Sequence, residues 1–393
     1  MKPTRFGIIG TAGRGGVYLD ENHRPDEGYE IIAGADIDAE AGKTFQERFP
    51  QAAFYTDYRM LLANPDVDAV FIVTPDFLHR EMAAAALDAG KDVCLEKPIA
   101  LGMADAVDIC RAAMRNRKKL YLAHNMRFFP IIRKMHSLIR SGIIGVPQAL
   151  WCRHFINYGG DAYFRDWHSE RKNTCGLLLQ KGAHDIDIIH YLMGASTVQV
   201  SGMGMLSVYD KCRRRPDDGS AGKAIWEENN YPPEECEGFS PCIDVEDHNM
   251  IMMQLSSGAQ ACYMQCHYTP DNVRNYTIIG TRGRIENTGV SDKDKILVWN
   301  ERRNHHSEPD AVFNVKPSPG THSGADPLIM KDFREYIRFD RPASVNPVAA
   351  LLSVMVGEKG HESMRGKGER LDIPPIPQDI MEYFCNGKPE LLF

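Results

Sequence analysis

The chain has 393 residues, of which 43% are hydrophobic and 25% are charged, and its formal net charge is −7 at pH 7. This length exceeds one typical domain and suits two. The negative charge argues against nucleic acid as a partner, because a phosphate backbone attracts a basic surface. No uninterrupted apolar run is long enough to cross a bilayer, so we expect no membrane segment.

The N-terminal residues pass directly into an apolar segment, without the hydrophobic region and cleavage site of a signal peptide. The ten cysteines are scattered and form no C-x-x-C pair, a pattern typical of reduced thiols in a cytoplasm. Cys212, Cys236 and Cys242 fall in one loop-like region, where a metal or a disulfide stays open, although unpaired thiols are the simpler interpretation. We expect a cytoplasmic protein without a bound metal.

In residues 1–124, short apolar runs alternate with helical patterns. The apolar runs are Phe6–Ile9, Ile31–Ala35, Ala69–Val73, Val93–Leu95 and Leu120–Ala123. The helical patterns between them include Ala39–Phe49, His79–Leu87 and Met103–Met114. Continuous apolar strands that alternate with helices are typical of a parallel sheet covered on both faces. We therefore predict an α/β, doubly wound Rossmann domain over residues 1–124.

Residues 125–375 show many strands and few helices. The strand-like runs are Gln148–Phe155, Val198–Met205, Asn249–Leu255, Gln260–His267, Asn275–Ile279 and Ile296–Trp299. The helical patterns lie around Ala183–Leu192, Pro327–Arg338 and Val348–Met364. This order predicts an α+β domain with a large open, mostly antiparallel sheet. Because the outer face of such a sheet needs a cover, we expect a homodimer or homotetramer.

Two stretches fall outside this pattern. Residues from about 209 to 244 are polar, charged and rich in proline and glycine, which predicts a long loop or insertion. Loops of this length in compact domains are usually lids, binding loops or mobile segments. Residues 376–393 are expected to form a C-terminal tail.

A glycine-rich segment, Gly10-Thr11-Ala12-Gly13-Arg14-Gly15, follows the first apolar strand. Gly10 permits a tight turn out of the strand, Ala12 stands where a dinucleotide fingerprint has its second glycine, and Gly15 supplies the third. Small residues here let a pyrophosphate approach the backbone at a helix N-terminus, where N–H groups and the helix dipole favour anions. The segment therefore indicates a dinucleotide site.

Asp36 follows the second strand, about 20 residues beyond the glycines, where an acid binds the ribose hydroxyls. Ile37 is adjacent and belongs to the same expected site. No arginine stands beside them to receive a 2′-phosphate, so we expect NAD rather than NADP. The alternative is a nucleotide-free βαβ unit with an ordinary solvated acid.

Two further motifs, Thr74-Pro75-Asp76-x-x-His79 and Glu96-Lys97-Pro98, also follow apolar strands. They therefore lie at carboxyl ends of strands, where open α/β sheets bind ligands. Thr74-Pro75 is equally compatible with a simple turn, and Lys97 with a solvated surface. The proline after Lys97 restricts the local backbone and favours a defined position. The expected cofactor-binding residues in this part of the chain are Thr74, Pro75, His79, Glu96, Lys97 and Asn125.

With these motifs, the chain resembles the Gfo/Idh/MocA oxidoreductase family over nearly its whole length. The resemblance also rests on Asn125-x-Arg127-Phe128-x-Pro130, Gly176-(x)7-His184-x-x-Asp187 and Gly280-Thr281-x-Gly283. It implies a Rossmann domain, a second domain whose open sheet often mediates oligomerisation, and an active site between the two. It implies that Lys97 contacts the reacting oxygen and that His184 acts as acid or base. The family commonly has an acid four residues before this histidine, where this chain has Gln180.

The residues around His184 support a catalytic interpretation independently. Gln180, Lys181, His184 and Asp187 lie within helical reach of one another if the helix begins by Gln180. Lys181 would disfavour the imidazolium form of His184 and keep the base neutral. Polar and aromatic groups suit a hydroxyl-rich ligand. The candidate substrate-binding residues are Lys97, Arg127, His154, Asn157, Trp167, Lys181 and His184, and each could instead be structural.

The sequence thus predicts an NAD-dependent dehydrogenase that oxidises a secondary alcohol of a sugar, glycoside or cyclitol. Its catalytic residues would be Lys97, His184 and Gln180. Three alternatives stay open: an NAD-retaining lyase or glycosidase that works through a transient keto-sugar, a non-catalytic NAD-binding protein, and a reductase of imines or bilins on the same scaffold.

Overall fold

The computed structural model describes residues 3–220, 222–225, 230–291, 293–316, 318–388 and 392–393. The chain forms two compact units. Unit 1 consists of Met1–Phe128, Ser318–Leu351 and Ile376–Leu392, and unit 2 of Phe129–Pro317, Leu352–Pro375 and Phe393. Two segments from the last fifth of the chain therefore return to the N-terminal unit, which the hydrophobic pattern did not indicate.

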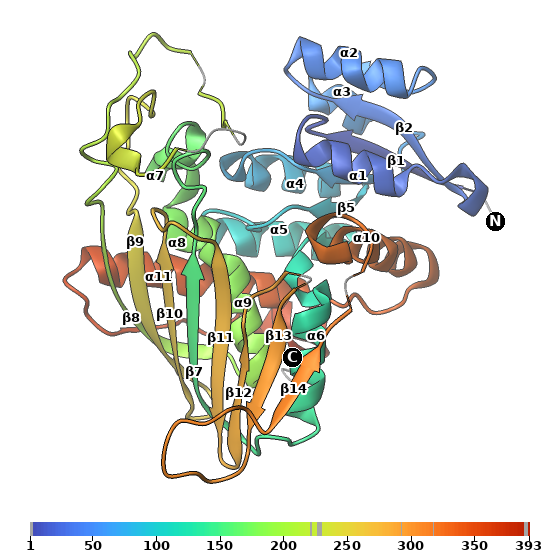
Figure 1. Cartoon of the computed structure of the whole chain (residues 1–393). Coiled ribbons are helices and arrows are strands. Elements are labelled where there is room, and N and C mark those ends of the chain that lie inside the picture. Colours follow the sequence, from blue (N-terminus) through green and yellow to red (C-terminus); the bar gives the residue numbers. More distant parts are fainter. Residues whose placement is uncertain (1–2, 221, 226–229, 292, 317, 389–391) are drawn as a thin grey trace. The chain divides into compact units, whose positions relative to one another are not determined.

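Unit 1 is built on six parallel strands in the order β3-β2-β1-β4-β5-β6 (Figure 1). The strands are β1 (Thr4–Ile9), β2 (Tyr29–Ala35), β3 (Ala53–Tyr55), β4 (Ala69–Ile72), β5 (Asp92–Leu95) and β6 (Leu120–Leu122). All four residues of β4 are buried, as expected for a central strand of a parallel sheet with helices on both faces. This order is that of a doubly wound dinucleotide-binding fold, so the predicted fold class is confirmed.

The helices of unit 1 come from three parts of the chain. They are α1 (Arg14–Asn22), α2 (Ala39–Arg48), α3 (Tyr58–Ala63), α4 (His79–Asp88), α5 (Met103–Asn116), α10 (Thr321–Phe339) and α12 (Gln378–Cys385). Asp38 and Asp57 cap α2 and α3 by accepting hydrogen bonds from the backbone N–H groups of Glu40 and Arg59, each at 2.9 Å. The first turn of α10 is irregular, because His322, Ser323 and Gly324 have positive φ angles of 50°, 56° and 78°.

Unit 2 holds a nine-stranded sheet in the order β14-β13-β12-β11-β7-β10-β9-β8-β15. Its strands are β7 (Pro147–Phe155), β8 (Thr197–Met205), β9 (His248–Leu255), β10 (Gln260–Cys266), β11 (Val273–Gly280), β12 (Gly283–Asn287), β13 (Lys295–Trp299), β14 (Ala311–Asn314) and β15 (Leu371–Asp372). The pair β7 and β10 is parallel, and the other seven adjacent pairs are antiparallel. The prediction of a large, mostly antiparallel sheet is therefore confirmed.

One face of this sheet is covered by helices. The helices of unit 2 are α6 (Pro130–Arg140), α7 (Arg171–Thr174), α8 (Leu177–Gln180) and α9 (Gly182–Met193), and α11 (Pro347–Arg365) runs from unit 1 into unit 2. Helix α9 packs on β7 and β10, and α6 packs on β12 and β13, behind the strands in Figure 1. Buried residues alternate with exposed ones along β9, as expected for a strand with one covered face.

The long polar stretch after β8 belongs to unit 2 and packs there around a small cluster of buried residues that includes Tyr209, Phe164 and Phe239. Tyr209 stacks on Phe164 with ring centroids 3.7 Å apart, and its hydroxyl donates to the carbonyl of His267 at 2.9 Å. One carboxylate oxygen of Asp247 accepts the backbone N–H groups of Ser207, Val208 and Tyr209. Residues 221 and 226–229 of the predicted 209–244 loop lie outside the described residues.

The glycine turn of unit 1 gives a direct test of its packing. A Cβ added at Gly15 would lie 2.0 Å from the carbonyl oxygen of Gly10, whereas one added at Gly16 would meet nothing within 4 Å. Gly15→Ala should therefore lower the free energy of unfolding by about 1–3 kcal/mol. The control Gly16→Ala should leave it unchanged or raise it by up to about 1 kcal/mol, because alanine favours a helix. Urea unfolding of the cofactor-free protein measures both, and equal effects would show that the turn is not tightly packed.

Candidate functional site

A cavity of about 710 Å³ lies in unit 1 beside the carboxyl ends of its central strands. Ile9 and Gly10 from the end of β1, Ala35 and Asp36 from the end of β2, and Val73 and Thr74 after β4 all line it. In the sheet, β1 stands between β2 and β4, so the cavity lies where the strand order reverses. Open α/β sheets bind their ligands at this switch point.

The glycine turn shapes one wall of the cavity. Gly10 has a φ of +89°, which a side chain rarely adopts, and a Cβ there would lie 2.3 Å from the carbonyl oxygen of Val73. Nothing lies within 4 Å of a Cβ built at Gly13, so the outer side of the turn is open. Helix α1 begins at Arg14, immediately after it. This cradle fits a pyrophosphate group at a helix N-terminus.

Asp36 is fixed at the edge of the same cavity. One of its carboxylate oxygens accepts the backbone N–H of Thr11 at 2.8 Å, and the other accepts the N–H of Asp38 at 3.0 Å. The predicted residues Ile37, Thr74 and Pro75 line the cavity with it. So do Asp57 and Glu81, and the guanidinium of Arg59 lies 2.6 Å from Glu81. The lining therefore has more acidic than basic charge.

Arg14 faces two carboxylates. Its guanidinium donates to Glu96 at 2.8 Å and to both oxygens of Asp326 at 2.7 and 2.8 Å. Burial alone would raise the pKa of Asp326, but His322 and Arg14 hold it well below its usual range. The charge of Arg14 is thus neutralised by protein carboxylates. Arg14, which the sequence placed among the cofactor ligands, does not line the cavity, and its guanidinium joins the glycine turn to Glu96 and Asp326.

Glu96 and Lys97 stand at the carboxyl end of β5. One oxygen of Glu96 accepts from Arg14 and from the hydroxyl of Tyr18, each at 2.8 Å, and the other accepts the backbone N–H of Lys97 at 2.9 Å. Burial alone would raise the pKa of Glu96, but the charges of Arg14 and Lys97 lower it below its usual value. Glu96 is therefore ionised, and it fixes the backbone from which the half-buried Lys97 side chain extends.

The other residues of unit 1 predicted for the site are buried. The ring nitrogens of His79 lie 2.7 Å from the carbonyl oxygen of Pro98 and 3.0 Å from that of Thr74. Burial lowers the pKa of His79, so the ring is neutral. Through these contacts it connects the turn after β4 with the turn after β5. Asn125 is buried, and so is Arg127, whose guanidinium donates to the carbonyl of Leu392 at 2.9 Å. These three side chains are therefore part of the interior of unit 1, and none of them lines the cavity.

In unit 2, the segment from α8 to α9 carries the other candidate catalytic residues. Helix α8 ends at Gln180, α9 begins at Gly182, and Lys181 between them keeps helical dihedral angles of −98° and −40°. Gln180 and His184 therefore lie about one helical turn apart, as predicted. Both side chains are buried, and Asp187 is buried one turn further along α9.

Lys181 lies between two tyrosine rings. Its ammonium is 5.3 Å from the ring centroid of Tyr158 and 5.6 Å from that of Tyr163, within the range of cation–π attraction. Burial alone would lower the pKa of Lys181, but its contacts with Tyr158 and Tyr163 raise it above the usual value. The faces of the two rings thus stabilise the ammonium form of the side chain.

A fully buried carboxylate, Asp185, organises the interior of unit 2 beside these residues. It lies 3.1 Å from the guanidinium of Arg274 and 3.0 Å from Nδ1 of His154. The hydroxyls of Tyr276 and Tyr263 donate to it at 2.5 and 3.1 Å. Burial alone would raise the pKa of Asp185, but Arg274 and His154 hold it well below its usual range. Asp185 is therefore ionised and paired.

His154 belongs to a polar row that crosses four neighbouring strands. It pairs in register with Arg274 on β11 and with Gln265 on β10, and Gln265 pairs with Asn249 on β9. His154 is only 2% exposed, and burial and Arg274 lower its pKa to about 3. His154, which the sequence predicted to bind substrate, is therefore a buried and neutral side chain of strand β7.

The two remaining candidates lie nearer the surface of unit 2. Asn157 is exposed. Trp167 is half-buried and stacks on His168, with ring centroids 3.7 Å apart. His168 in turn lies 2.6 Å from Asp166, and the ring of Tyr163 meets it edge-on at 5.0 Å. Trp167, His168 and Tyr163 thus form a contiguous aromatic group.

Sequence reasoning missed two sets of residues. In the cavity of unit 1 they are Asp57 and Arg59, which follow the short strand β3, and Glu81 on α4, which contacts Arg59. In unit 2 they are Asp185, Arg274 and the tyrosines that contact them. An acid beside His184 in a largely apolar helix that also carries Asp187 and His190 was the available signal for Asp185, but its partners on β10 and β11 are distant in sequence.

The comparisons with known proteins identify both parts of the chain. Residues 4–124 match the family model GFO_IDH_MocA, described as "Oxidoreductase family, NAD-binding Rossmann fold". Residues 136–373 match GFO_IDH_MocA_C, described as "Oxidoreductase family, C-terminal alpha/beta domain". The two matches together cover most of the chain.

Individual relatives agree with this assignment. The protein YteT of Bacillus subtilis (strain 168) is 25% identical over 352 residues, which is 77% of this chain and 82% of YteT. The inositol 2-dehydrogenase/D-chiro-inositol 3-dehydrogenase of Lacticaseibacillus casei is 31% identical over 191 residues, 48% of this chain and 53% of that protein. The match thus spans about half of the inositol enzyme.

A solved structure shows the same fold. A levoglucosan dehydrogenase in complex with NADH and levoglucosan superposes with a TM-score of 0.77, covering 95% of this chain and 100% of the other, at 20% sequence identity. Within the part of the chain that the structure describes, no helix is long and apolar enough to cross a membrane, and no three His, Cys, Asp or Glu side chains gather as metal ligands. All ten cysteines are free, including Cys212, Cys236 and Cys242.

The buried pair of Asp185 and Arg274 predicts a large loss of stability when its charge balance is broken. Asp185→Asn leaves the Arg274 guanidinium buried without a counter-charge, which should lower the free energy of unfolding by about 3–5 kcal/mol. Glu170→Gln is the control, because Glu170 pairs at 2.6 Å with Lys172, whose side chain is 71% exposed, and such pairs contribute little. Chemical denaturation compares the variants, and similar midpoints would contradict the buried ion pair.

Proposed function

The chain belongs to the Gfo/Idh/MocA family of oxidoreductases, and from this premise we propose that it catalyses the NAD-dependent oxidation of a secondary hydroxyl on a sugar, glycoside or cyclitol. The observation that carries the proposal is the placement of Lys97. It extends from a backbone held by Glu96 at the carboxyl end of β5, on the same edge of the parallel sheet as the dinucleotide cavity at the ends of β1, β2 and β4. The names of the inositol and levoglucosan dehydrogenases support a polyol or sugar substrate.

In this proposal one side chain removes the hydroxyl proton and another stabilises the negative charge on the oxygen. When bound, the nicotinamide ring supplies the acceptor for the hydride. His184 takes the proton of the substrate hydroxyl as general base. The Lys97 ammonium stabilises the negative charge that develops on the same oxygen. Because Glu96 fixes the backbone of Lys97, this charge needs little reorganisation during the reaction.

Gln180 replaces the acid that the family commonly has. A carboxylate one turn before His184 would favour the imidazolium form, whereas an amide carries no charge and can donate and accept hydrogen bonds. We therefore assign Gln180 to orienting the substrate or the imidazole. His184 then accepts a proton without a carboxylate at position 180.

The direct test is a screen of pyranosides, free sugars and inositols for NADH formation, followed by its near-ultraviolet absorbance. The proposal expects NADH to accumulate in proportion to a suitable substrate. An NAD-retaining lyase or glycosidase would convert substrate without net NADH, and a non-catalytic NAD-binding protein would convert none. Either result would contradict the dehydrogenase.

Cofactor preference follows from the acidic edge of the cavity. Asp36 should accept the ribose hydroxyls of NAD and repel the 2′-phosphate of NADP. We expect NAD to bind well ahead of NADP, and Asp36→Ala to weaken NAD and reduce the preference. Titration calorimetry with both cofactors measures this, with the exposed Asp26→Ala as control. Equal affinities in the unaltered protein would mean that Asp36 does not face the ribose.

Loss of either catalytic group should affect turnover far more than cofactor binding. His184→Ala should lower kcat by about 10²–10⁴-fold, as typical for a general base, and Lys97→Ala by about 10²–10³-fold, as typical for an electrostatic donor. NAD affinity should stay nearly unchanged in both. Steady-state kinetics and calorimetry give the two readouts, and full turnover by His184→Ala would refute its assignment.

Gln180→Asp separates the two roles of position 180. A carboxylate beside His184 favours imidazolium, so a higher pH is needed to form the neutral base, and the rising limb of the pH–rate profile should move to higher pH. Gln180→Ala should mainly raise KM. A limb that stays in place in Gln180→Asp would mean that His184 is not the titrating base or that position 180 does not face it.

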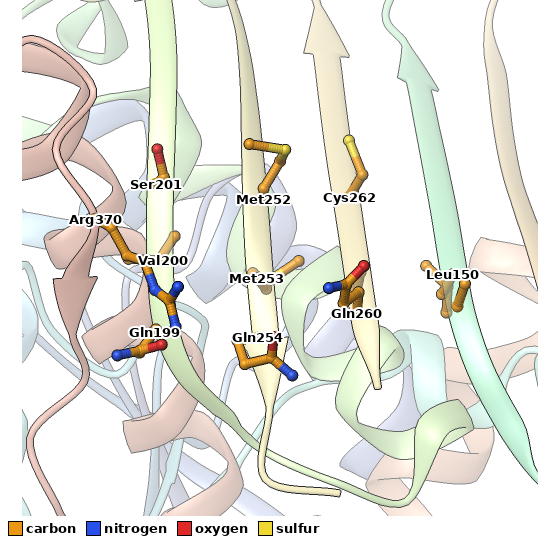
Figure 2. A pocket seen from close by; sticks show the side chains of 12 residues that line it. Leu150, Gln199, Val200, Ser201, Met252, Met253, Gln254, Gln260, Cys262 and Arg370 are labelled. Carbon is orange, nitrogen blue, oxygen red and sulfur yellow. The ribbon is translucent and has the colours of Figure 1, made fainter. Parts of the chain in front are cut away.

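The outer face of the nine-stranded sheet favours self-association. Met203, Met252 and Trp151 are 72%, 62% and 53% exposed on three of its strands. Met252, Cys262 and Ser201 lie on adjacent strands (Figure 2) and line a hollow of about 390 Å³ together with Gln199, Gln254 and Arg370. Exposed apolar patches of this kind mark interaction surfaces. We assign the face to contact with a second copy of the chain.

A charge placed in this face should therefore dissociate the assembly. The protein should be a dimer or tetramer at micromolar concentration, and Met252→Glu should shift it toward monomer, because the new carboxylate would be buried at the interface. Light scattering measures the mass. The control Met60→Glu changes an exposed methionine of unit 1, which is 58% exposed. A monomeric unaltered protein would contradict this assignment.

A further inference from the structure

We propose that the substrate of this enzyme carries a carboxylate and that Lys181 binds it. The inference rests on the proposed function, because it assigns a substrate class to the same site. It restricts the proposed substrates, which are sugars, glycosides and cyclitols, to those that carry a carboxylate, such as uronosides and cyclitol carboxylates. The argument starts from the charges around Lys181 in unit 2.

Lys181 is a half-buried cation whose contacts are aromatic. Its ammonium lies over the rings of Tyr158 and Tyr163, and no carboxylate lies within 4.0 Å of it among the residues that the structure describes. Cation–π contacts compensate only part of the hydration that an ammonium loses on burial. An anion bound beside the Lys181 ammonium would compensate the rest of this loss.

The neighbouring carboxylate does not supply that anion. Asp185 lies 3.1 Å from Arg274 and accepts hydrogen bonds from two tyrosine hydroxyls, so its charge is already matched. The nearby histidines are neutral and do not change this balance. Burial and the charge of Arg274 lower the pKa of His154 to about 3, and burial holds the pKa of His267 well below its usual value. Lys181, Arg274 and Asp185 together therefore carry one excess positive charge.

Tyr163 does not neutralise Lys181 either. Burial raises the pKa of its phenol to about 12, although Lys181 acts in the opposite direction. At neutral pH the phenol is therefore protonated. Its hydroxyl and ring hold the ammonium in place, and the positive charge remains available to a ligand.

The position of this charge in the chain points to the substrate. Lys181 immediately follows Gln180 and precedes His184 by less than one helical turn. The segment Leu177–His184 contains no acid, since Gln180 stands where a carboxylate would repel an anionic ligand. One lysine matches one negative charge, which favours a carboxylate over a phosphate dianion.

The competing explanation is that Lys181 only ties the two tyrosine rings together. Removing the charge would then affect stability and the turnover of every substrate alike. Substrate recognition instead predicts an effect limited to acidic substrates. Matched pairs of neutral and acidic substrates therefore separate the two.

The experiment compares methyl β-D-glucoside with methyl β-D-glucuronide, the corresponding galactosides, and myo-inositol with quinate, using the complete protein with NAD. The acidic member of at least one pair should have a kcat/KM about 10- to 100-fold higher, the range of a charge-assisted hydrogen bond. Added salt should reduce this advantage. Lys181→Met should abolish it, measured within the variant as the ratio of kcat/KM for the acidic member to kcat/KM for the neutral member, so that a general effect of the substitution on turnover cancels.

Two further variants serve as controls: Lys181→Arg tests the charge at position 181, and Lys172→Met tests the loss of an exposed lysine. Lys181→Arg keeps the charge and should retain part of the advantage. Lys172 is an exposed lysine of unit 2 and should be replaceable without effect. Thermal unfolding verifies that each variant is folded, and if Lys181→Met is not, Lys181→Arg and the salt dependence carry the test.

Three outcomes would overturn the inference. They are equal kcat/KM within every pair, an acidic advantage that survives in Lys181→Met, or a Lys181-dependent preference for glucose 6-phosphate over glucuronide. NADH formation with neutral substrates alone would leave the dehydrogenase standing and refute only the carboxylate. If none of the compounds reduces NAD, calorimetry of glucuronide and glucoside against the NAD-bound protein decides. Lys181-dependent binding of glucuronide then supports the inference, and its absence overturns it, while the dehydrogenase proposal fails separately.

Discussion

The buried carboxylate of Glu96 is the interaction on which the organisation of unit 1 depends. It accepts hydrogen bonds from Arg14 at the start of α1, from Tyr18 one turn later and from the backbone of Lys97. Arg14 extends the connection to Asp326, 312 residues further along the chain. One ionised group therefore fixes the glycine turn, the first helix and the strand end that presents Lys97. A catalytic charge held in this way is oriented before the substrate arrives.

Unit 2 contains several ionisable groups around Arg274, and all but one of them are paired or neutral. Its interior accommodates Arg274 and His154 on adjacent strands and Asp185 on helix α9, where the carboxylate pairs with Arg274 and the imidazole of His154 is neutral. Lys181 is the exception, since its contacts are the rings of Tyr158 and Tyr163. Paired charges beside one cation that has no carboxylate within 4.0 Å among the described residues are more typical of a binding site than of an arrangement for stability, because buried ion pairs by themselves add little stability.

Much of the fold could be predicted from the sequence, and the reasons for the failures are physical. Continuous apolar runs such as Ile31–Ala35 correctly predicted both the strands and the parallel sheet, because a strand that is buried on both faces requires continuous apolar residues. The three-residue strand β3 was missed because it is too short for a pattern, and Asp57, Arg59 and Glu81 were missed with it.

The candidate site was predicted where local spacing decides it and missed where packing decides it. Gly10, Asp36, Lys97 and His184 follow from motifs, and the structure places the first two at the cavity. His154 has the character of a ligand-binding residue, but strand register pairs it with Arg274 and Gln265 in the interior. Arg14 stands in the glycine motif, but its partner Asp326 comes from a segment whose return to unit 1 no periodicity reveals.

The central claim is that a carbinol hydrogen moves from the substrate to the nicotinamide ring. The most direct measurement uses a substrate of the screen deuterated at the carbon that is oxidised, with mass spectrometry and NMR of the cofactor after a single turnover. The account predicts deuterium at C4 of the nicotinamide and a slower reaction than with the protiated substrate. Deuterium that appears in water, or a product that forms while the cofactor gains no deuterium, would contradict it.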